Sequence, residues 1–212
     1  MTMVASVLHL DRRAIKQLRI TDPYSLHRVV YSLYEDVRTE EQKRQGVGSG
    51  ILFANDGGYE GGRRVLLLAN RPPAEKVEGE FGNVESKVIN SAFLSHSHYR
   101  FKVVINATQR DNTNRKLNPI VGRLAITDWF VEKAKQAWGF EVIKHHVRVE
   151  NMDVLVFKGK AQRFITISQA TLFGQFVVQD EDKFVHSFKN GIGRAKTFGC
   201  GLLQIVPILE IE

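Results

Sequence analysis

The chain has 212 residues, 43% of them apolar, and its 30 Lys and Arg against 23 Asp and Glu give a net charge of +7. This excess suggests a polyanionic partner, and the length allows one or two buried cores. A single cysteine, Cys200, excludes a disulfide framework and a multi-cysteine zinc site, so a reducing, cytoplasmic setting is expected. The apolar start at 4–10 is too short for a signal peptide, and no apolar run approaches the ~20 residues that span a bilayer, so we expect no membrane association.

The first half of the chain predicts the order β-α-β-β-(α)-β. Asp22 followed by Pro23 marks a helix start, because Asp is a good N-cap and Pro fits the first helical position. The apolar residues of this helix fall at helical spacing and predict a buried stripe of Leu26, Val29, Val30, Leu33 and Tyr34. The expected elements are a strand at 3–10, a helix at 23–37, strands at 50–55 and 63–70, and a strand at 99–107.

The second half predicts a similar split pattern of strands and helices. Its expected elements are a helix at 124–138, strands at 140–149, 154–157 and 163–178, a helix that begins near Asp180 and a strand at 202–208. The economical interpretation is an α+β protein with two tandem ferredoxin-like (RRM-like, βαββαβ) domains. We expect a first domain at 1–108, a linker at 109–122 and a second domain at 123–212. This fold binds RNA in many proteins and does unrelated work in others, so it does not settle function.

A glycine-rich stretch at 191–201 is the most distinctive local feature, with four glycines and two cations in eleven residues. Such a loop can bring backbone N–H groups and positive charge close to a phosphate. It is not a Walker A loop, and Lys196 breaks the GxGxxG pattern. A mononucleotide site is therefore disfavoured, and the alternative is a tight turn between a helix and a strand.

A resemblance to a known family is carried mainly by the C-terminal third of the chain. The run Arg163-Phe-Ile-Thr-Ile-Ser-Gln-Ala-Thr-Leu-Phe-Gly-Gln-Phe-Val-Val-Gln-Asp, continued into the glycine-rich stretch, resembles the C-terminal signature of CasE. CasE is the CRISPR repeat-processing endoribonuclease of the type I-E surveillance complex, in the RAMP superfamily. Segments at 22–27, 99–108 and 115–121 are similar to this family in the same order. The region 38–97 departs from it, and Tyr31 stands where a basic residue is often expected.

Tyr24 and His27 are the candidate catalytic residues, since they stand three positions apart on the predicted helix and project from one face near its positive end. RNA supplies its own nucleophile, the 2′-OH, so cleavage needs a base, an acid for the departing 5′-oxygen and cations, with no metal or cofactor. His27 suits proton transfer because its ordinary pKa is ~6.5, whereas Tyr24, at ~10, suits orienting the 2′-OH or donating a proton. The alternative is that both are packing residues.

Basic residues provide the expected RNA contacts. The segment Lys158-Gly-Lys160 predicts a hairpin turn, and the resemblance implies that a basic hairpin here grips the stem of the repeat RNA. A-form RNA hides its base edges, so these residues would contact mainly phosphates. For each cation alone, a solvated surface charge is the alternative. The residues expected to contact RNA are Arg28, Arg115, Lys116, Arg123, Lys158, Lys160, Arg163, Gly191, Gly193, Arg194 and Lys196.

Together these features predict a metal-independent endoribonuclease that binds the CRISPR repeat hairpin and cleaves at the 3′ side of its stem. Attack by the 2′-OH would leave a 2′,3′-cyclic phosphate. The resemblance implies that the protein stays bound to mature crRNA together with other subunits of the type I-E complex. Two alternatives are a non-catalytic subunit that binds structured RNA on the same scaffold and a nuclease that acts on another structured RNA.

Overall fold

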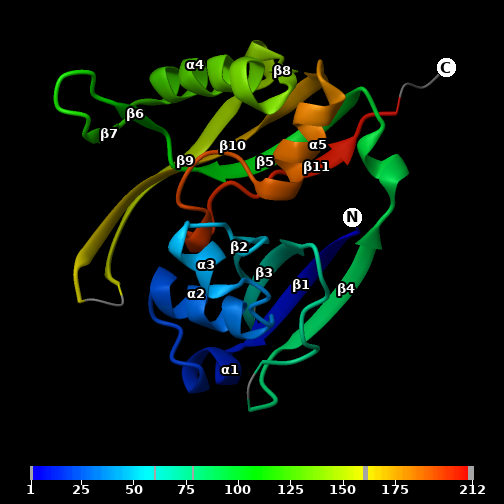
Figure 1. The fold of residues 1–212 in the computed structure, drawn as a ribbon, viewed down its shortest axis with the longest axis vertical. Helices are drawn as coiled ribbons and strands as arrows, with labels where there is room; N and C mark the ends of the chain where they lie inside the picture. The colour runs from blue at the N-terminus through cyan, green and yellow to red at the C-terminus, as the bar shows by residue number, and fades with distance from the viewer. Residues whose placement is uncertain (1, 60, 78, 160–161, 210–212) are drawn as a thin grey trace. The chain divides into compact units, whose positions relative to one another are not determined.

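A computed structural model of the chain describes residues 2–59, 61–77, 79–159 and 162–209. The chain divides into two compact units, one made of Met1–Ile89 with Thr197–Gly199 and the other of Asn90–Lys196 with Cys200–Glu212. Each unit contains an antiparallel sheet and helices (Figure 1). The predicted α+β class with two ferredoxin-like repeats is confirmed.

The first unit has a four-stranded antiparallel sheet with the strand order β2-β3-β1-β4. Strand β3 therefore lies between β1 and β2, the two strands that helix α2 connects, which is the split β-α-β arrangement of ferredoxin-like repeats. Between β3 and β4 the described residues form no second helix. The elements of this unit are β1 (Met3–Asp11), α1 (Arg12–Gln17), α2 (Pro23–Ser32), α3 (Glu40–Arg44), β2 (Ile51–Tyr59), β3 (Gly62–Ala69) and β4 (Asn83–Ile89).

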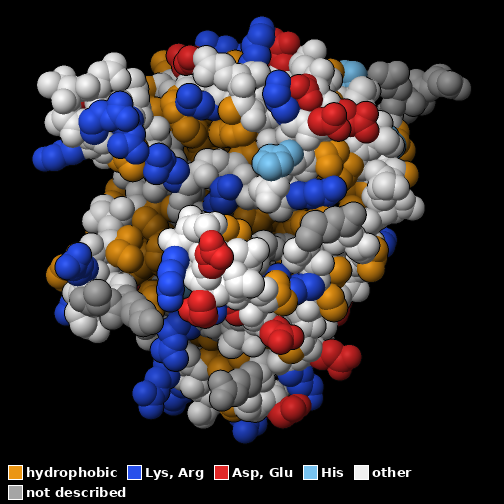
Figure 2. All heavy atoms as spheres, in the orientation of Figure 1, with side chains coloured by type: hydrophobic (Ala, Val, Ile, Leu, Met, Phe, Trp, Pro, Cys, Tyr) orange, Lys and Arg blue, Asp and Glu red, His pale blue; other side chains and the backbone are white. Residues whose placement is uncertain are grey.

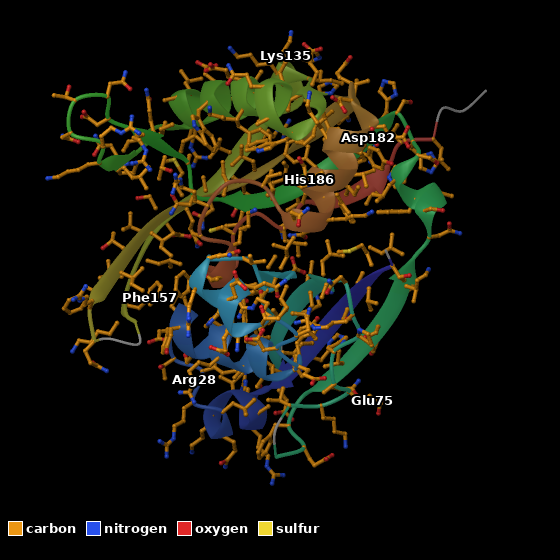
Figure 3. All side chains as sticks on the ribbon, viewed as in Figure 1. Arg28, Glu75, Lys135, Phe157, Asp182 and His186 are labelled. Atoms are coloured by element: carbon orange, nitrogen blue, oxygen red, sulfur yellow. The ribbon has the colours of Figure 1, made fainter. Side chains whose placement is uncertain are left out.

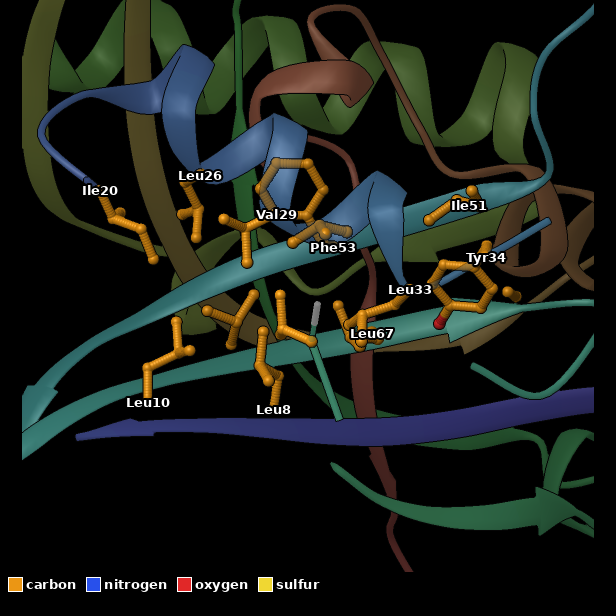
Figure 4. Packing of buried hydrophobic residues seen from close by; sticks show 14 of the residues in the cluster. Leu8, Leu10, Ile20, Leu26, Val29, Leu33, Tyr34, Ile51, Phe53 and Leu67 are labelled. Carbon is orange, nitrogen blue, oxygen red and sulfur yellow. The ribbon is translucent and has the colours of Figure 1, made fainter. Parts of the chain in front are cut away.

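The core of the first unit lies between α2 and one face of the sheet. Leu26 and Val29 of α2 and Leu33 just after it are buried, as the apolar stripe predicted, and they belong to the same packed cluster as Leu8 and Phe53 of the sheet (Figure 4). Burial of each such side chain is worth about 1.5–3 kcal/mol. This packing fixes the rotation of α2 about its axis and leaves the opposite side of the helix for polar and aromatic residues.

The second unit repeats the same strand arrangement. Its sheet has the order β11-β5-β10-β8, and β9 also pairs with β10. Helix α4 continues into a π-helical turn at Ala134–Trp138. The elements of this unit are β5 (His98–Ile105), β6 (Thr108–Arg110), β7 (Leu117–Pro119), α4 (Arg123–Lys133), β8 (Phe140–Val142), β9 (Arg148–Lys158), β10 (Phe164–Val178), α5 (Glu181–Asn190) and β11 (Gln204–Pro207).

The division between the units falls earlier in the chain than the sequence predicted. The strand expected to end the first domain is β5, which pairs with β10 and β11 and so opens the second unit. The last strand of the first unit is instead β4, which pairs with β1 and was not predicted. Most of its side chains are exposed, so it carries no apolar pattern. The expected linker at 109–122 holds β7 and the turn of the short β6–β7 hairpin.

Two further elements differ from their predicted extent. The helix expected at 23–37 ends at Ser32 with Leu33 as its C-cap, and residues 35–37 have no regular structure. The strand expected at 140–149 is interrupted by a 3₁₀ turn at Lys144–His146, so β8 ends at Val142 and β9 begins at Arg148. The strands β9 and β10 pair in antiparallel register, as the predicted hairpin requires.

Candidate functional site

Helix α2 begins with a capping box that fixes its first turn. The Asp22 carboxylate accepts a hydrogen bond from the Ser25 backbone N–H at 2.7 Å, and the Ser25 hydroxyl accepts one from the Asp22 N–H at 2.9 Å. Pro23 occupies the first helical position, so the helix starts where the sequence predicted. The capped turn holds Tyr24 and His27 at defined positions, since both follow the cap within two turns.

Three aromatic side chains lie beside the core stripe of α2, and one of them, Tyr31, also packs against the core. Tyr24, His27 and Tyr31 follow one another at spacings of three and four residues, which places them on one side of a helix. The Tyr24 and His27 rings lie stacked with centroids 6.1 Å apart, and the His27 and Tyr31 centroids lie 4.1 Å apart. The structure therefore brings together the two residues that the sequence singled out for catalysis.

His27 is half-buried, and its surroundings favour the neutral imidazole. Burial lowers the pKa of His27 below its ordinary value, and a weaker interaction with the Thr197 backbone acts in the opposite direction. The ring atom Nδ1 is buried without a hydrogen-bond partner among the described residues. A protonated ring would place an unpaired N–H there, which is costly. These surroundings therefore favour an imidazole that is neutral and able to accept a proton.

Two neighbours of His27 were not predicted as site residues. The Tyr31 hydroxyl accepts a hydrogen bond from the Ser49 hydroxyl at 3.0 Å, and the Phe198 ring lies 5.8 Å from His27 between centroids. Tyr31 could have been found from its helical spacing to His27. Phe198 could not, because it comes from a distant part of the chain and only the fold brings it to α2.

Arg28 was expected to contact RNA and lies exposed on α2 (Figure 3). It follows His27 directly, and adjacent residues on a helix point in different directions. A phosphate bound at the Tyr24–His27 side would therefore meet Arg28 only at the margin of that site.

The glycine-rich stretch is a folded loop of the second unit from 191 to 196. The Ile192 N–H donates to the Gly201 carbonyl at 2.9 Å, which closes the loop. Lys196 is half-buried, and its ammonium donates to the Asn190 carbonyl at 2.8 Å, at the end of α5. Burial lowers the pKa of Lys196. Of the two cations expected to contact RNA here, only Arg194 is exposed.

The loop glycines differ in their packing. Gly191 and Gly193 both have φ of +71°, a conformation that favours glycine. A Cβ at Gly193 would meet no atom within 4 Å, so space for a ligand exists beside its backbone. Gly191 is buried and caps the C-terminal end of α5.

The β9–β10 ribbon carries an exposed group of charged and aromatic residues at its end. Lys158 pairs across the strands with Phe164, and its ammonium lies 5.5 Å from the centre of that ring. Arg163 is exposed beside them, and Phe164 itself is 71% exposed. Lys160, which was also expected to contact RNA, lies outside the described residues. Phe164 was not predicted as a site residue, although an aromatic ring next to cations is typical of RNA-binding surfaces.

Arg115 and Lys116 lie exposed in the turn of the β6–β7 hairpin. Arg115 has φ of +60°, and its carbonyl accepts a hydrogen bond from the Arg110 guanidinium at 2.8 Å. Figure 2 shows Lys and Arg side chains gathered over this hairpin. Both residues are exposed, and their contact with RNA stays a prediction.

Arg123 has a structural role that the sequence did not predict. Its guanidinium donates to the carbonyls of Val149 and Glu150, the latter at 3.2 Å. This contact ties the start of α4 to the start of β9. Arg123 is exposed, but its guanidinium is partly engaged within the protein.

No group of three or more His, Cys, Asp or Glu side chains within the described ranges is arranged to hold a metal ion. In the same part of the chain, no helix has the length and apolar character needed to cross a membrane. The side chains around His27 are aromatic rather than carboxylate or thiolate, so they do not form a metal-ligand set.

Solved structures share this fold over nearly the whole chain. The CRISPR endoribonuclease Cse3 bound to a 19-nucleotide RNA is 17% identical, with a TM-score of 0.81 over 98% of this chain and 100% of that one. Cse3 from Thermus thermophilus, bound to an RNA representing a pre-cleavage complex, is 17% identical with a TM-score of 0.77 over 98% and 100%. A chain of a CRISPR RNA-guided surveillance complex is 21% identical with a TM-score of 0.68 over 97% and 100%.

A family match identifies the chain more directly than the shared fold. Residues 3–207 match the family described as CRISPR associated protein, and the chain belongs to this family. No curated protein shows significant sequence similarity to it. The resemblance to CasE stated from the sequence is thus confirmed by both the family and the fold.

Proposed function

We propose that this protein is a metal-independent endoribonuclease that cleaves CRISPR repeat RNA. It binds the hairpin of the repeat in the precursor and cuts at the 3′ side of the stem. The mature crRNA stays bound, and the protein serves as a subunit of the type I-E surveillance complex in the cytoplasm. Family membership and the fold shared with RNA-bound Cse3 support the processing of CRISPR RNA.

The observation that carries the proposal is the position of His27 beside Tyr24 on the capped first turns of α2. In the reaction, the 2′-OH loses its proton and its oxygen bonds to phosphorus, while the bond from phosphorus to the 5′-oxygen breaks. The 5′-oxygen takes up a proton, and the products are a 2′,3′-cyclic phosphate and a 5′-hydroxyl. No step changes an oxidation state or requires a co-reactant.

His27 supplies the group for proton transfer. Its imidazole, held beside Tyr24 on α2, exchanges a proton with the RNA. Tyr24 stacks beside it and orients the 2′-OH or donates a proton. General acid–base catalysis by one such side chain is typically worth about 10²–10⁴-fold in rate.

The exposed cations bind the RNA without taking part in the chemistry. Lys158 and Arg163 on the β9–β10 ribbon, and Arg115 and Lys116 on the β6–β7 hairpin, present charge to solvent. Phosphate contacts of this kind position a nucleic acid and make its affinity depend on salt.

The test is cleavage of an end-labelled repeat hairpin in excess chelator by the wild type, His27→Ala and a control, His186→Ala. His186 is an exposed histidine on α5, so its loss leaves the site intact (Figure 3). A second substrate carries a 2′-deoxy sugar at the scissile nucleotide. We expect His27→Ala to cut at least about 100-fold more slowly with unchanged RNA affinity, and the deoxy RNA to stay intact.

Other outcomes separate the alternatives. Tight binding by the wild type without cutting would indicate a non-catalytic RNA-binding subunit. Equal cutting of unrelated stem-loops would indicate a nuclease for another structured RNA. Cutting that persists undiminished in His27→Ala would exclude His27 as the catalytic histidine, and cutting that chelator abolishes would exclude the metal-independent mechanism.

A further inference from the structure

One tripeptide from late in the chain, Thr197–Gly199, belongs to the first unit together with α2. Its anchor is Gly199, which has φ of +86° and lies so close to Phe53 that a Cβ there would be 3.2 Å from the ring. Phe53 is a fully buried member of the core beneath α2. The tripeptide is therefore packed onto the core of this unit and holds a defined position there.

From this position the tripeptide contacts His27. The Phe198 ring lies 5.8 Å from the imidazole between centroids, with the two planes inclined by 53°. The backbone of Thr197 also interacts with the imidazole. His27 is thus enclosed by Tyr24 and Tyr31 from its own helix and by Phe198 from a second segment.

The groups that face His27 explain why its pKa is lowered. On α2 they are the hydroxyl-bearing rings of Tyr24 and Tyr31, and on the second segment they are Phe198 and the Thr197 backbone. Among the described residues, no charged side chain contributes to the pKa of His27, which burial lowers. Water exclusion by the surrounding rings is therefore the main physical cause of its depressed basicity.

We propose that Phe198 is a positioning residue for His27, and that its ring holds the imidazole in one orientation against α2 and keeps water from one of its sides. The inference rests on the proposed function, because it gives His27 the role of proton transfer. Phe198 acts through His27 and has no contact with the reacting atoms in this role.

The experiment compares Phe198→Ala, Phe198→Leu and Phe198→Tyr with the wild type. Leucine keeps apolar volume without a ring, and tyrosine keeps the ring. Phe93→Leu is the matched control, because Phe93 is also half-buried and makes ring contacts, but with Tyr99 and Phe188 of the second unit. The readouts are the pKa of His27 by NMR titration of the free protein, the single-turnover cleavage rate at saturating RNA across pH, and the RNA Kd.

We expect Phe198→Ala to raise the pKa of His27 toward its ordinary value of ~6.5, because water reaches the ring. The pH below which cleavage declines should rise with it, and the rate at neutral pH should fall about tenfold through loss of orientation. The Kd should stay within about twofold, since phosphate contacts elsewhere carry the affinity. Phe198→Tyr should restore rate and pKa, Phe198→Leu should restore them partly, and Phe93→Leu should change neither.

An unchanged pKa of His27 in folded Phe198→Ala and Phe198→Leu proteins would overturn the inference. So would a Kd that weakens by the same factor as the rate, since Phe198 would then be a direct RNA contact. The NMR titration needs no RNA. If the wild type does not cleave at all, the proposed function fails, while the titration still decides whether Phe198 controls the surroundings of His27.

Discussion

Two segments of similar composition differ in how their cations are packed. They are the glycine-rich stretch at 191–201 and the end of the β9–β10 ribbon at 158–163. Both combine glycine with Lys and Arg. In the first, Lys196 is half-buried and bonded to the Asn190 carbonyl. In the second, Lys158 and Arg163 are exposed. Composition alone marks both as phosphate-binding, whereas packing shows which cations are available to a ligand.

The difference follows from what surrounds each segment. The glycine-rich stretch joins α5 to β11, and its backbone must turn sharply against buried residues such as Ile192. The ribbon end joins two strands that pair only with each other near the turn, since β5 pairs with β10 only from Ala170 onward. A loop packed on its own unit uses its polar groups internally, and a projecting ribbon leaves them in solvent.

The largest expected effect is on stability, in the glycine-rich stretch. Gly201 has φ of +82°, and a Cβ there would overlap the Ile192 carbonyl oxygen, so Gly201→Ala should lower the free energy of unfolding by about 3 kcal/mol. Gly193→Ala is the matched control, because it shares the positive φ but has open space, and it should cost only about 1 kcal/mol. Urea denaturation measures both. Equal losses of unfolding free energy in the two variants would contradict the close packing of Gly201 against Ile192.

The next effect is on RNA affinity, at the ribbon. Replacing Lys158 and Arg163 together by Ala should weaken the RNA Kd about tenfold near physiological salt and reduce the slope of log Kd against log salt by about 1.5. The cleavage rate at saturating RNA should not change, because the proposed catalytic residues Tyr24 and His27 stay in place. Binding measured across a salt series checks this. An unchanged slope would show that the ribbon does not meet phosphates.

The smallest effect distinguishes two neighbours within the glycine-rich stretch. Lys196→Ala removes the hydrogen bond to the Asn190 carbonyl and should lower the free energy of unfolding by about 1 kcal/mol. Arg194→Ala, at an exposed position, should leave stability unchanged but reduce the salt slope of RNA binding by about 0.8. Thermal unfolding of both variants measures the change in stability, and RNA-binding titrations at several salt concentrations measure the change in slope. The opposite pattern would indicate that Lys196 contacts phosphates and that Arg194 does not.

Much of the fold was predictable because most elements have one buried face. The apolar stripe of α2 and the apolar alternation of β5 predicted a helix and a strand, because apolar periodicity follows burial. Strand β4 was missed for the opposite reason. It is an edge strand whose side chains are largely exposed, as with Glu85 and Lys87, so its pairing depends on backbone hydrogen bonds to β1 rather than on apolar residues. This omission moved the predicted domain boundary from Ile89 to 108.

The candidate site was predictable only where its geometry is local. The spacing of Tyr24 and His27 and the Asp22 cap are properties of one helix, and the structure places both rings together. Ser49 and Phe198 reach the site through tertiary packing, which one sequence does not encode in any short pattern. For the same reason the sequence could not show that Arg123 binds carbonyls of β9.

The return of Thr197–Gly199 to the first unit has a consequence for biosynthesis. Helix α2 emerges early during translation. Phe198, whose ring lies against His27, is synthesised only after most of the second unit has been synthesised. Contacts between residues so distant in sequence form late in folding, because closing a long loop costs entropy. A nascent chain therefore exposes His27 without Phe198, and the complete His27 environment arises only after residues 197–199 have been synthesised and packed.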